Sequence, residues 1–160
     1  MKKNSIVLIE PEIPYNTGNI ARTCVITDTA LHLVRPFGFQ LTDHYIRRSG
    51  MDYWEKTDLT IWDSLDEFTA HMEEEAKNGA HICYIETGAI HRIDQIEAKN
   101  PVMLLFGKES KGLPKSLLDA HPERCYRIPM APDQRSLNLS NSAAIALFEV
   151  LRQQGYPGLI

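Results

Sequence analysis

The sequence predicts an α/β fold in which a mainly parallel β-sheet is flanked by helices on both faces. Short runs of β-branched or aromatic residues, typical of strands, alternate along the chain with longer stretches that have helical spacing. Strands that alternate with helices imply a parallel sheet covered on both sides. The chain has 160 residues and no repeat or low-complexity tract, so we expect one domain spanning residues 1–160.

The expected strands are short runs rich in apolar residues. They lie at residues 5–10, 31–34, 58–62, 81–86, 102–107 and 125–129. A first helix is expected at residues 18–27, directly after the first strand. In this order of elements, the first helix connects the first two strands of the parallel sheet.

A second helix is expected at residues 64–79. It carries Leu65, Phe68 and Met72 at helical spacing and stops at Gly79, a residue that commonly ends helices. The apolar stripe predicts that one face of this helix packs on the sheet.

The composition excludes several classes of protein. No apolar run approaches the roughly 20 residues that cross a bilayer, and the N-terminal apolar stretch is too short for a signal peptide, so we expect a cytoplasmic protein without a membrane partner. Cys24, Cys83 and Cys125 are far apart, which favours structural burial over disulfides or zinc. The six histidines are scattered, and we expect no metal.

The negative charge is confined to one segment. The formal net charge is −4, and residues 63–79 hold six acidic residues against one lysine, so the remainder of the chain carries +1. A local basic face can therefore exist, and the net charge does not exclude an RNA partner.

Three segments follow expected strands and are rich in glycine, proline or small polar residues. They are residues 85–92, 106–114 and 129–140. Ligands in parallel α/β sheets bind beyond the carboxyl ends of the strands. The three segments therefore predict one ligand site.

The segment at residues 106–114 reads "FGKESKGLP" and fits no phosphate-loop pattern. Gly107 and Gly112 would let the backbone approach a ligand closely. The alternative is an ordinary strand-to-helix loop, with Pro114 at the start of the helix.

The segment "NTGNIAR" at residues 16–22 follows the first strand. Asn16 or Thr17 would cap the helix. Capping does not explain Arg22, which stands among apolar residues of the same helix. Its alternatives are a functional cation and a solvated surface arginine.

The segment "YIRRSGMDYWE" at residues 45–55 combines Arg47 and Arg48 with aromatic residues. Arginines pair with phosphates and aromatic rings stack on bases, so this composition suits RNA. A loop that is packed by its own aromatic residues is the alternative.

The stretch at residues 128–155 places many small polar residues before an apolar helix, which runs from about Ser140 to Gln154. Asn138 or Ser140 would cap the helix. Capping leaves Arg135, Ser136 and Asn141 unexplained. The broad apolar surface of the helix indicates burial against a second subunit as well as the sheet; core packing alone is the alternative. The apolar positions are 144, 145, 147, 148, 150 and 151.

Together, "NTGNIAR", "LLFGKESKGLP" and "IPMAPDQRSLNLSNSAAIALFEVLRQ" resemble the three motifs of the SPOUT class of RNA methyltransferases. The resemblance spans nearly the whole chain. It implies a trefoil knot in the C-terminal half of the sheet, which periodicity does not indicate and which is rare among folds. It also implies S-adenosylmethionine as cofactor, S-adenosylhomocysteine as product and no metal. The cofactor contacts would fall at Ile85, Gly107, Ile128, Ser136 and Leu137.

"EPEIPYNTGNIAR", "RRSGMDYWE" and "GYPG" resemble the small TrmL-like branch of this class, which methylates the wobble ribose of leucine tRNAs. The resemblance implies a homodimer with shared sites that acts on the anticodon loop. Arg22 matches the catalytic arginine of the family. Because a guanidinium stays protonated, we expect it to stabilise the developing alkoxide and hold a phosphate, a contribution of roughly 3–4 kcal/mol. The other matching active-site positions are Asn16, Glu109, Ser136 and Asn138.

Two positions depart from the pattern: Phe148 stands where some relatives have tyrosine, and Gly88 where relatives have lysine. The first departure leaves the proton acceptor unassigned, and the second would weaken one RNA contact. The competing hypotheses are methylation of another ribose in tRNA or rRNA and a catalytically silent RNA-binding protein. A nicotinamide-dependent enzyme is a third hypothesis, but the sequence lacks the glycine-rich fingerprint of that class.

Overall fold

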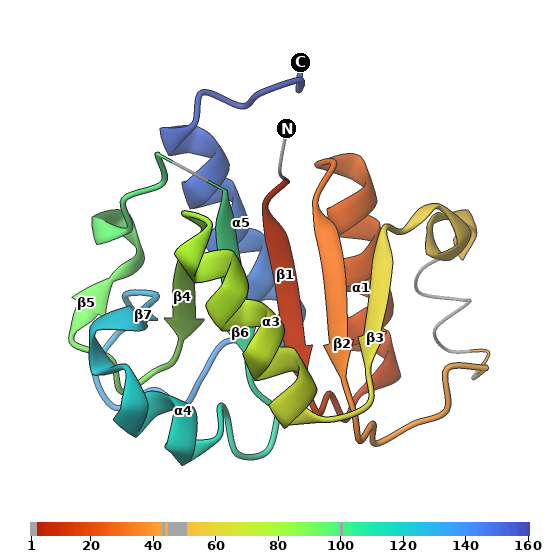
Figure 1. Ribbon diagram of the computed structural model, residues 1–160, viewed down its shortest axis with the longest axis horizontal. Helices are drawn as coiled ribbons and strands as arrows, with labels where there is room; N and C mark the ends of the chain where they lie inside the picture. The colour runs from red at the N-terminus through yellow and green to blue at the C-terminus, as the bar shows by residue number, and fades with distance from the viewer. Residues whose placement is uncertain (1–2, 43, 45–50, 100) are drawn as a thin grey trace.

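The computed structural model describes residues 3–42, 44, 51–99 and 101–160. Its centre is a seven-stranded sheet with the strand order β3-β2-β1-β6-β4-β7-β5, in which every pair of neighbouring strands is parallel (Figure 1). The strands are β1 (Ser5–Ile9), β2 (Ala30–Val34), β3 (Leu59–Trp62), β4 (His81–Ile85), β5 (His91–Arg92), β6 (Val102–Phe106) and β7 (Cys125–Arg127).

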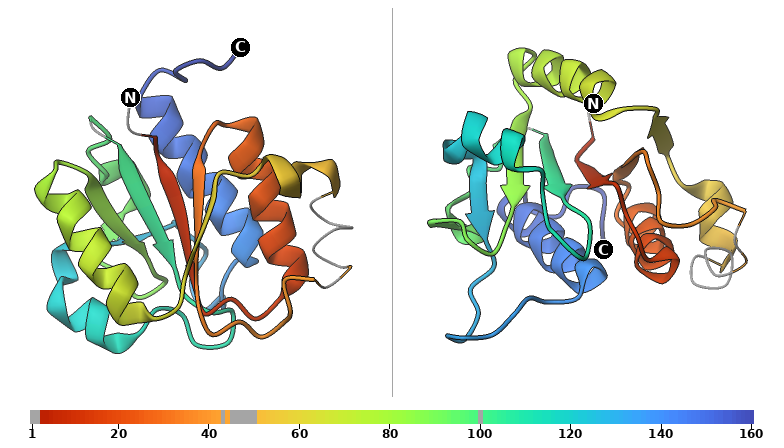
Figure 2. Two further views of the ribbon diagram at one scale, coloured as in Figure 1. Left: turned by 45° about the vertical axis from the view of Figure 1, so that its right-hand side comes forward. Right: turned by 90° about the horizontal axis from the view of Figure 1, so that it is seen from below.

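Helices cover both faces of the sheet. The α-helices are α1 (Pro14–Ile26), α3 (Leu65–Lys77), α4 (Lys115–Ala120) and α5 (Leu139–Gln153). Short 3-10 helices are η1 (Met51–Lys56), η2 (Ile93–Gln95) and η3 (Pro122–Arg124). Figure 2 shows α1 and α5 on one face, with α3 on the other. The prediction of a parallel sheet flanked by helices on both faces is confirmed.

The core is divided by the sheet, and β1 shows why. Side chains along a strand point alternately to the two faces. Ile6 and Leu8 therefore pack with α1 and α5, while Val7 and Ile9 pack with α3 and α4. All four are buried, which explains why this strand is a continuous apolar run rather than an alternating one.

The six expected strands are present within one or two residues of their predicted limits. The two-residue strand β5, both residues of which are exposed, was not expected, whereas α4 is the short helix expected to begin at Pro114. The second expected helix is α3, whose N-cap Ser64 accepts a hydrogen bond from the Glu67 amide. Gly79, just beyond its end, has a φ of 95° that suits glycine.

The start of α1 corrects the sequence analysis. The helix begins at Pro14, four residues before its predicted start, and Ile13 occupies the N-cap position without a side-chain bond. Asn16 and Thr17 therefore lie inside the helix, and the prediction that one of them caps it is wrong. Proline is favoured at the first position because its missing amide would have no partner there.

Two of the three cysteines are buried as expected, and Cys125 is partly exposed. Cys24 and Cys83 are fully buried, and burial raises the pKa of the Cys24 thiol to about 12 and that of Cys83 further. Among the described residues, no group of three or more potential ligands is arranged to hold a metal ion. In the same part of the chain, no helix is long and apolar enough to cross a membrane.

Candidate active site

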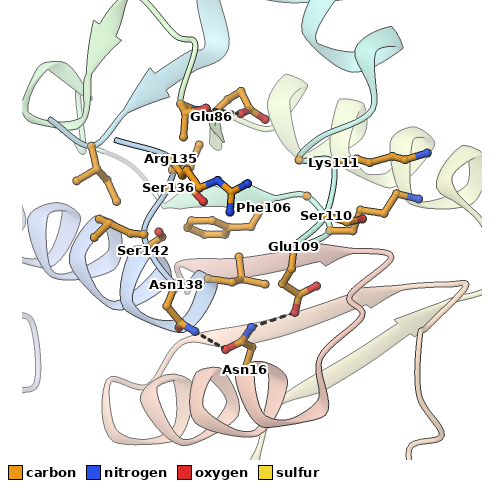
Figure 3. Close-up of a pocket in the computed structure, with 18 of the residues that line it drawn as sticks. Asn16, Glu86, Phe106, Glu109, Ser110, Lys111, Arg135, Ser136, Asn138 and Ser142 are labelled. Carbon is orange, nitrogen blue, oxygen red and sulfur yellow. Dashed lines mark hydrogen bonds between the residues drawn. The ribbon is translucent and has the colours of Figure 1, made fainter. Parts of the chain in front are cut away.

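A cavity of about 550 Å³ lies at the carboxyl ends of β4, β6 and β7, beside the start of α1 (Figure 3). Its walls come from the three segments that the sequence analysis expected to form one ligand site. The lining residues are 13, 16, 85–87, 106–112, 128, 130, 135–139 and 142. The prediction that these segments converge is confirmed.

Most of the residues predicted for the site line this cavity. All five predicted cofactor contacts do so, together with three other predicted active-site residues: Ile85, Gly107, Ile128, Ser136, Leu137, Asn16, Glu109 and Asn138. Arg22 is not among the lining residues. Arg47 and Arg48, predicted to bind RNA, lie outside the described residues.

Glu109 holds the start of α1. Its carboxylate accepts hydrogen bonds from the backbone amides of Glu12 and Ile13, at 2.8 and 3.1 Å, and from the Asn16 side-chain amide at 3.1 Å. Glu12 and Ile13 stand directly before Pro14, the first residue of the helix, and Asn16 lies in its first turn. Glu109 therefore fixes, from another loop, the point at which the chain enters α1.

Asn16 continues this connection to α5. Its side-chain oxygen accepts a hydrogen bond from Nδ2 of Asn138 at 3.0 Å (Figure 3). The oxygen of Asn138 in turn caps α5, accepting from the amides of Ser140 and Asn141 at 2.9 and 3.3 Å. The capping of α5 by Asn138 is as expected. A single chain of side chains therefore fixes two helix starts and the loop after β6 against one another.

The two glycines of the loop after β6 serve the packing of that loop. A Cβ on Gly107 would lie 1.9 Å from the carbonyl carbon of Gly112, and Gly112 itself has a φ of 71°. The loop closes by a hydrogen bond of 2.8 Å from the Gly112 amide to the Lys108 carbonyl. Close packing against backbone is thus one reason for glycine at position 107, and the close approach of this loop to a ligand stays a prediction.

Two further carboxylates fasten this loop, and the sequence analysis did not single them out. Glu86 accepts a hydrogen bond from the Leu113 amide at 3.2 Å and from the Thr87 amide at 2.9 Å. Glu12 accepts from the amide and hydroxyl of Ser110, both at 2.9 Å, and these bonds lower its pKa. Position after a strand was the only sequence signal for Glu86.

Arg22 lies apart from the cavity on the exposed face of α1, with its guanidinium carbon 5.2 Å from the ring centroid of Tyr53. Its separation from Asn16 has a geometric cause. Six residues at about 100° each make about 600°, which is one full turn and about 240° more, so the two side chains point in different directions. Apolar side chains are also exposed at the start of α1 and on α5: Ile13, Ile145 and Phe148 are 43%, 42% and 44% exposed.

The cavity can hold a nucleoside-type cofactor. Its volume of about 550 Å³ is ordinary for small-molecule sites. Ile85, Phe106, Ile128, Leu137 and Leu139 provide apolar walls, and the loops provide backbone donors and acceptors. The fold and this cavity define the class: a parallel α/β protein with a small-molecule site at the carboxyl ends of its strands.

The chain belongs to the SpoU rRNA Methylase family, whose model matches residues 3–148. A relative from Escherichia coli K12, named tRNA (cytidine(34)-2'-O)-methyltransferase, is 43% identical over 157 residues, covering 98% of this chain and 97% of the relative. The prediction of an RNA methyltransferase is confirmed.

Two solved structures extend the likeness. One, from work on 2-OH methylation of C/U34 on tRNA, is 37% identical, with a TM-score of 0.87 and coverage of 96% of this chain and 97% of the other. The second, an AdoMet-bound rRNA methyltransferase from Sinorhizobium meliloti, is 25% identical, with a TM-score of 0.82 and coverage of 94% and 56%. The latter holds the same kind of cofactor that the sequence analysis predicted.

Proposed function

We propose that this chain is an S-adenosylmethionine-dependent methyltransferase that modifies the ribose 2′-hydroxyl of nucleotide 34 in leucine tRNAs. The observation that carries the proposal is the convergence of all five predicted cofactor residues on one cavity. Relatives and a solved structure concerned with position 34 of tRNA support the substrate. The leucine isoacceptors follow from the resemblance of "RRSGMDYWE" and "GYPG" to the TrmL-like branch.

The cofactor supplies a methyl group already activated by its positive sulfur. Ile85, Gly107, Ile128 and Leu137 would hold it, because their segments form the walls of the cavity. Ser136 lines the same cavity with a hydroxyl that can orient polar groups of the cofactor or of the ribose.

The proposed role of Asn16, Glu109 and Asn138 is to fix the shape of the cavity. Their side chains bond to one another and to helix starts, so we assign them to positioning rather than to contact with the reacting atoms. A cavity fixed in this way holds the reacting groups in place before the reaction and so reduces the entropy that orientation would cost.

Arg22 is the proposed catalytic residue. Its guanidinium remains protonated, so it stabilises negative charge on the ribose oxygen and does not remove the proton. Since Arg22 does not line the cavity of its own chain, we propose that it completes the site of a second copy. The exposed Ile145 and Phe148 on α5 support such a homodimer, because buried subunit contacts are richer in apolar residues than the rest of a surface.

Two further expectations belong to the same proposal. Arg47 and Arg48 would bind phosphates of the anticodon loop, where arginines make bidentate contacts. The single domain 1–160 would act in the cytoplasm, where its tRNA substrate is found.

We also propose that the C-terminal half contains the trefoil knot of the SPOUT class. The chain leaves β7 near one side of the sheet and returns to α5, which packs against β6 and α1. The connection between β4 and β6 is the loop that this segment would pass through. An experimental electron-density map that traces residues 86–140 without crossing that loop would refute the knot.

The proposed function is tested with purified protein, labelled S-adenosylmethionine and tRNA from a strain that lacks the modification. Mapping by nuclease digestion and mass spectrometry should place the methyl group on the 2′-oxygen of nucleotide 34 of leucine tRNA. A methyl group at another ribose would refute the assigned position but leave the reaction. Absence of transfer, with tRNA bearing other anticodon-loop modifications also tested, would favour a silent RNA-binding protein.

A further inference from the structure

The cavity has an unpaired cationic group that the proposed function has not used. Three of its lining residues are cationic: Lys108, Lys111 and Arg135. Lys108 is engaged, because its Nζ lies 2.6 Å from Oε2 of Glu10. In Figure 3 the side chain of Lys111 extends away from the centre of the cavity, whereas the guanidinium of Arg135 points into it.

Arg135 has no hydrogen bond or ion pair within the described residues. Its neighbourhood offers two carboxylates, but each is occupied. Glu86 accepts from the loop amides of Thr87 and Leu113, and Glu109 accepts from the start of α1. The cavity therefore presents an exposed guanidinium whose five N–H donors bond to no acceptor among the described residues.

The backbone around Arg135 limits where this group can go. Asn138, three residues later, is tied to Asn16 at 3.0 Å and caps α5. Pro129 and Pro132 restrict the preceding segment. A side chain held near a cavity by a restrained loop loses less conformational entropy on binding than one on a free loop.

We propose that Arg135 is the anion-binding residue of this cavity and pairs with a carboxylate or phosphate oxygen of a bound ligand. A guanidinium matches both groups in bidentate geometry. The inference rests on the proposed function, which offers two such ligands: the carboxylate of the cofactor's methionine moiety and a phosphate beside the target ribose. The cofactor carboxylate is the expected partner, because Arg135 and the predicted cofactor contacts Ser136 and Leu137 are consecutive lining residues.

The test compares two probes in calorimetry, S-adenosylmethionine and decarboxylated S-adenosylmethionine, which differ by the carboxylate alone. The wild-type chain should bind the first more tightly. Arg135→Gln should weaken binding of S-adenosylmethionine by about tenfold or more, the scale of a charged hydrogen bond, and leave the decarboxylated probe within about twofold. Arg135→Lys keeps the charge but loses the bidentate geometry of the guanidinium. Its affinity for S-adenosylmethionine should lie between those of the wild-type chain and Arg135→Gln.

Lys115→Gln is the matched control, because it removes the same charge from an exposed residue that does not line this cavity. It should leave binding of both probes unchanged. If Arg135→Gln leaves the difference between the two probes intact but raises the Kd for tRNA and reduces its dependence on salt, the anion is a phosphate. If neither cofactor nor tRNA binding changes, Arg135 is not an anion-binding residue.

The same measurements separate this inference from the proposed function. A wild-type chain that binds neither probe would refute the proposed cofactor, whatever the behaviour of Arg135. A wild-type chain that binds S-adenosylmethionine, with an Arg135→Gln variant equal to it for cofactor and tRNA alike, would refute the inference alone.

Discussion

The cofactor cavity and the outer face of α1 and α5 are built on opposite principles. In the cavity, Glu109, Asn16 and Asn138 are bonded to each other and to helix starts, so that loops distant in sequence form one rigid wall. On the outer face, the guanidinium of Arg22 lies over the ring of Tyr53, and Phe148 is 44% exposed. One chain completes the first region, whereas the second is an exposed surface that carries an arginine and apolar side chains.

This contrast indicates a division of labour. Groups that bind the cofactor must be held in place before it arrives, and a network of hydrogen bonds achieves this within one chain. Residues that act on a large substrate can come from a second chain, because binding of the substrate and contact between the two chains can place them together. Substitutions in the two regions should therefore have separable effects on turnover and on cofactor binding.

Arg22→Ala should reduce turnover on leucine tRNA by about 10² to 10³, equivalent to roughly 3–4 kcal/mol of transition-state stabilisation. Affinity for S-adenosylmethionine should stay unchanged, because Arg22 does not line the cavity of its own chain. Single-turnover rates and calorimetry measure the two quantities. Equal losses in both would break the division between the two regions.

A mixing experiment sharpens the same prediction. Arg22→Ala chains keep an intact cavity, and Gly107→Val chains keep an intact Arg22. If Arg22 acts across the dimer, mixing the two inactive variants under conditions that exchange subunits should restore part of the activity. Mixtures that exchange subunits and remain inactive would place Arg22 in the site of its own chain.

His32, on the face of the sheet covered by α3, lies in neither region and makes the stability of the fold depend on pH. Nδ1 of His32 accepts a hydrogen bond from Nε1 of Trp62 at 3.1 Å, and burial, with a smaller contribution from His71, lowers the pKa of His32 from 6.5 to about 4. Between these values the unfolded chain binds a proton that the folded chain does not. Stability should therefore fall by at most roughly 3 kcal/mol as the pH drops from 6.5 to about 4.

Urea unfolding across this pH range measures the effect. His32→Gln keeps an acceptor for Trp62 without a titrating ring, so its stability should depend less steeply on pH. A slope identical to that of the wild-type chain would assign the acid sensitivity to other groups.

Much of this arrangement follows from local sequence. Apolar runs such as residues 102–107 identify buried strands, and the carboxyl ends of parallel strands meet, so the three polar loops had to converge. Local patterns could not find β5, whose two residues are exposed and carry no apolar signal. They also could not find that Glu109 fixes the segment before α1, because Glu12 and Glu109 are 97 residues apart in the sequence and meet only in the fold.

Gly107→Ala tests whether the cavity wall is as closely packed as the geometry indicates. The new Cβ would lie 1.9 Å from backbone of Gly112, so the loop must move. We expect a loss of about 1–3 kcal/mol in stability and weaker binding of S-adenosylmethionine. Gly88→Ala is the matched control: a Cβ there meets nothing within 4 Å, and both quantities should stay near wild type.

Asn138→Ala should cost about 1–2 kcal/mol, because it removes the cap of α5 and the bond to Asn16 together. Asn138→Asp separates the two roles. Its carboxylate can still cap the helix, but it has no amide to donate to the oxygen of Asn16. If the connection between the helices shapes the cavity, the aspartate variant should retain most of the stability measured in urea and still bind S-adenosylmethionine more weakly. Wild-type affinity in that variant would mean that capping alone maintains the wall, and that Asn16 and Asn138 meet without consequence for the site.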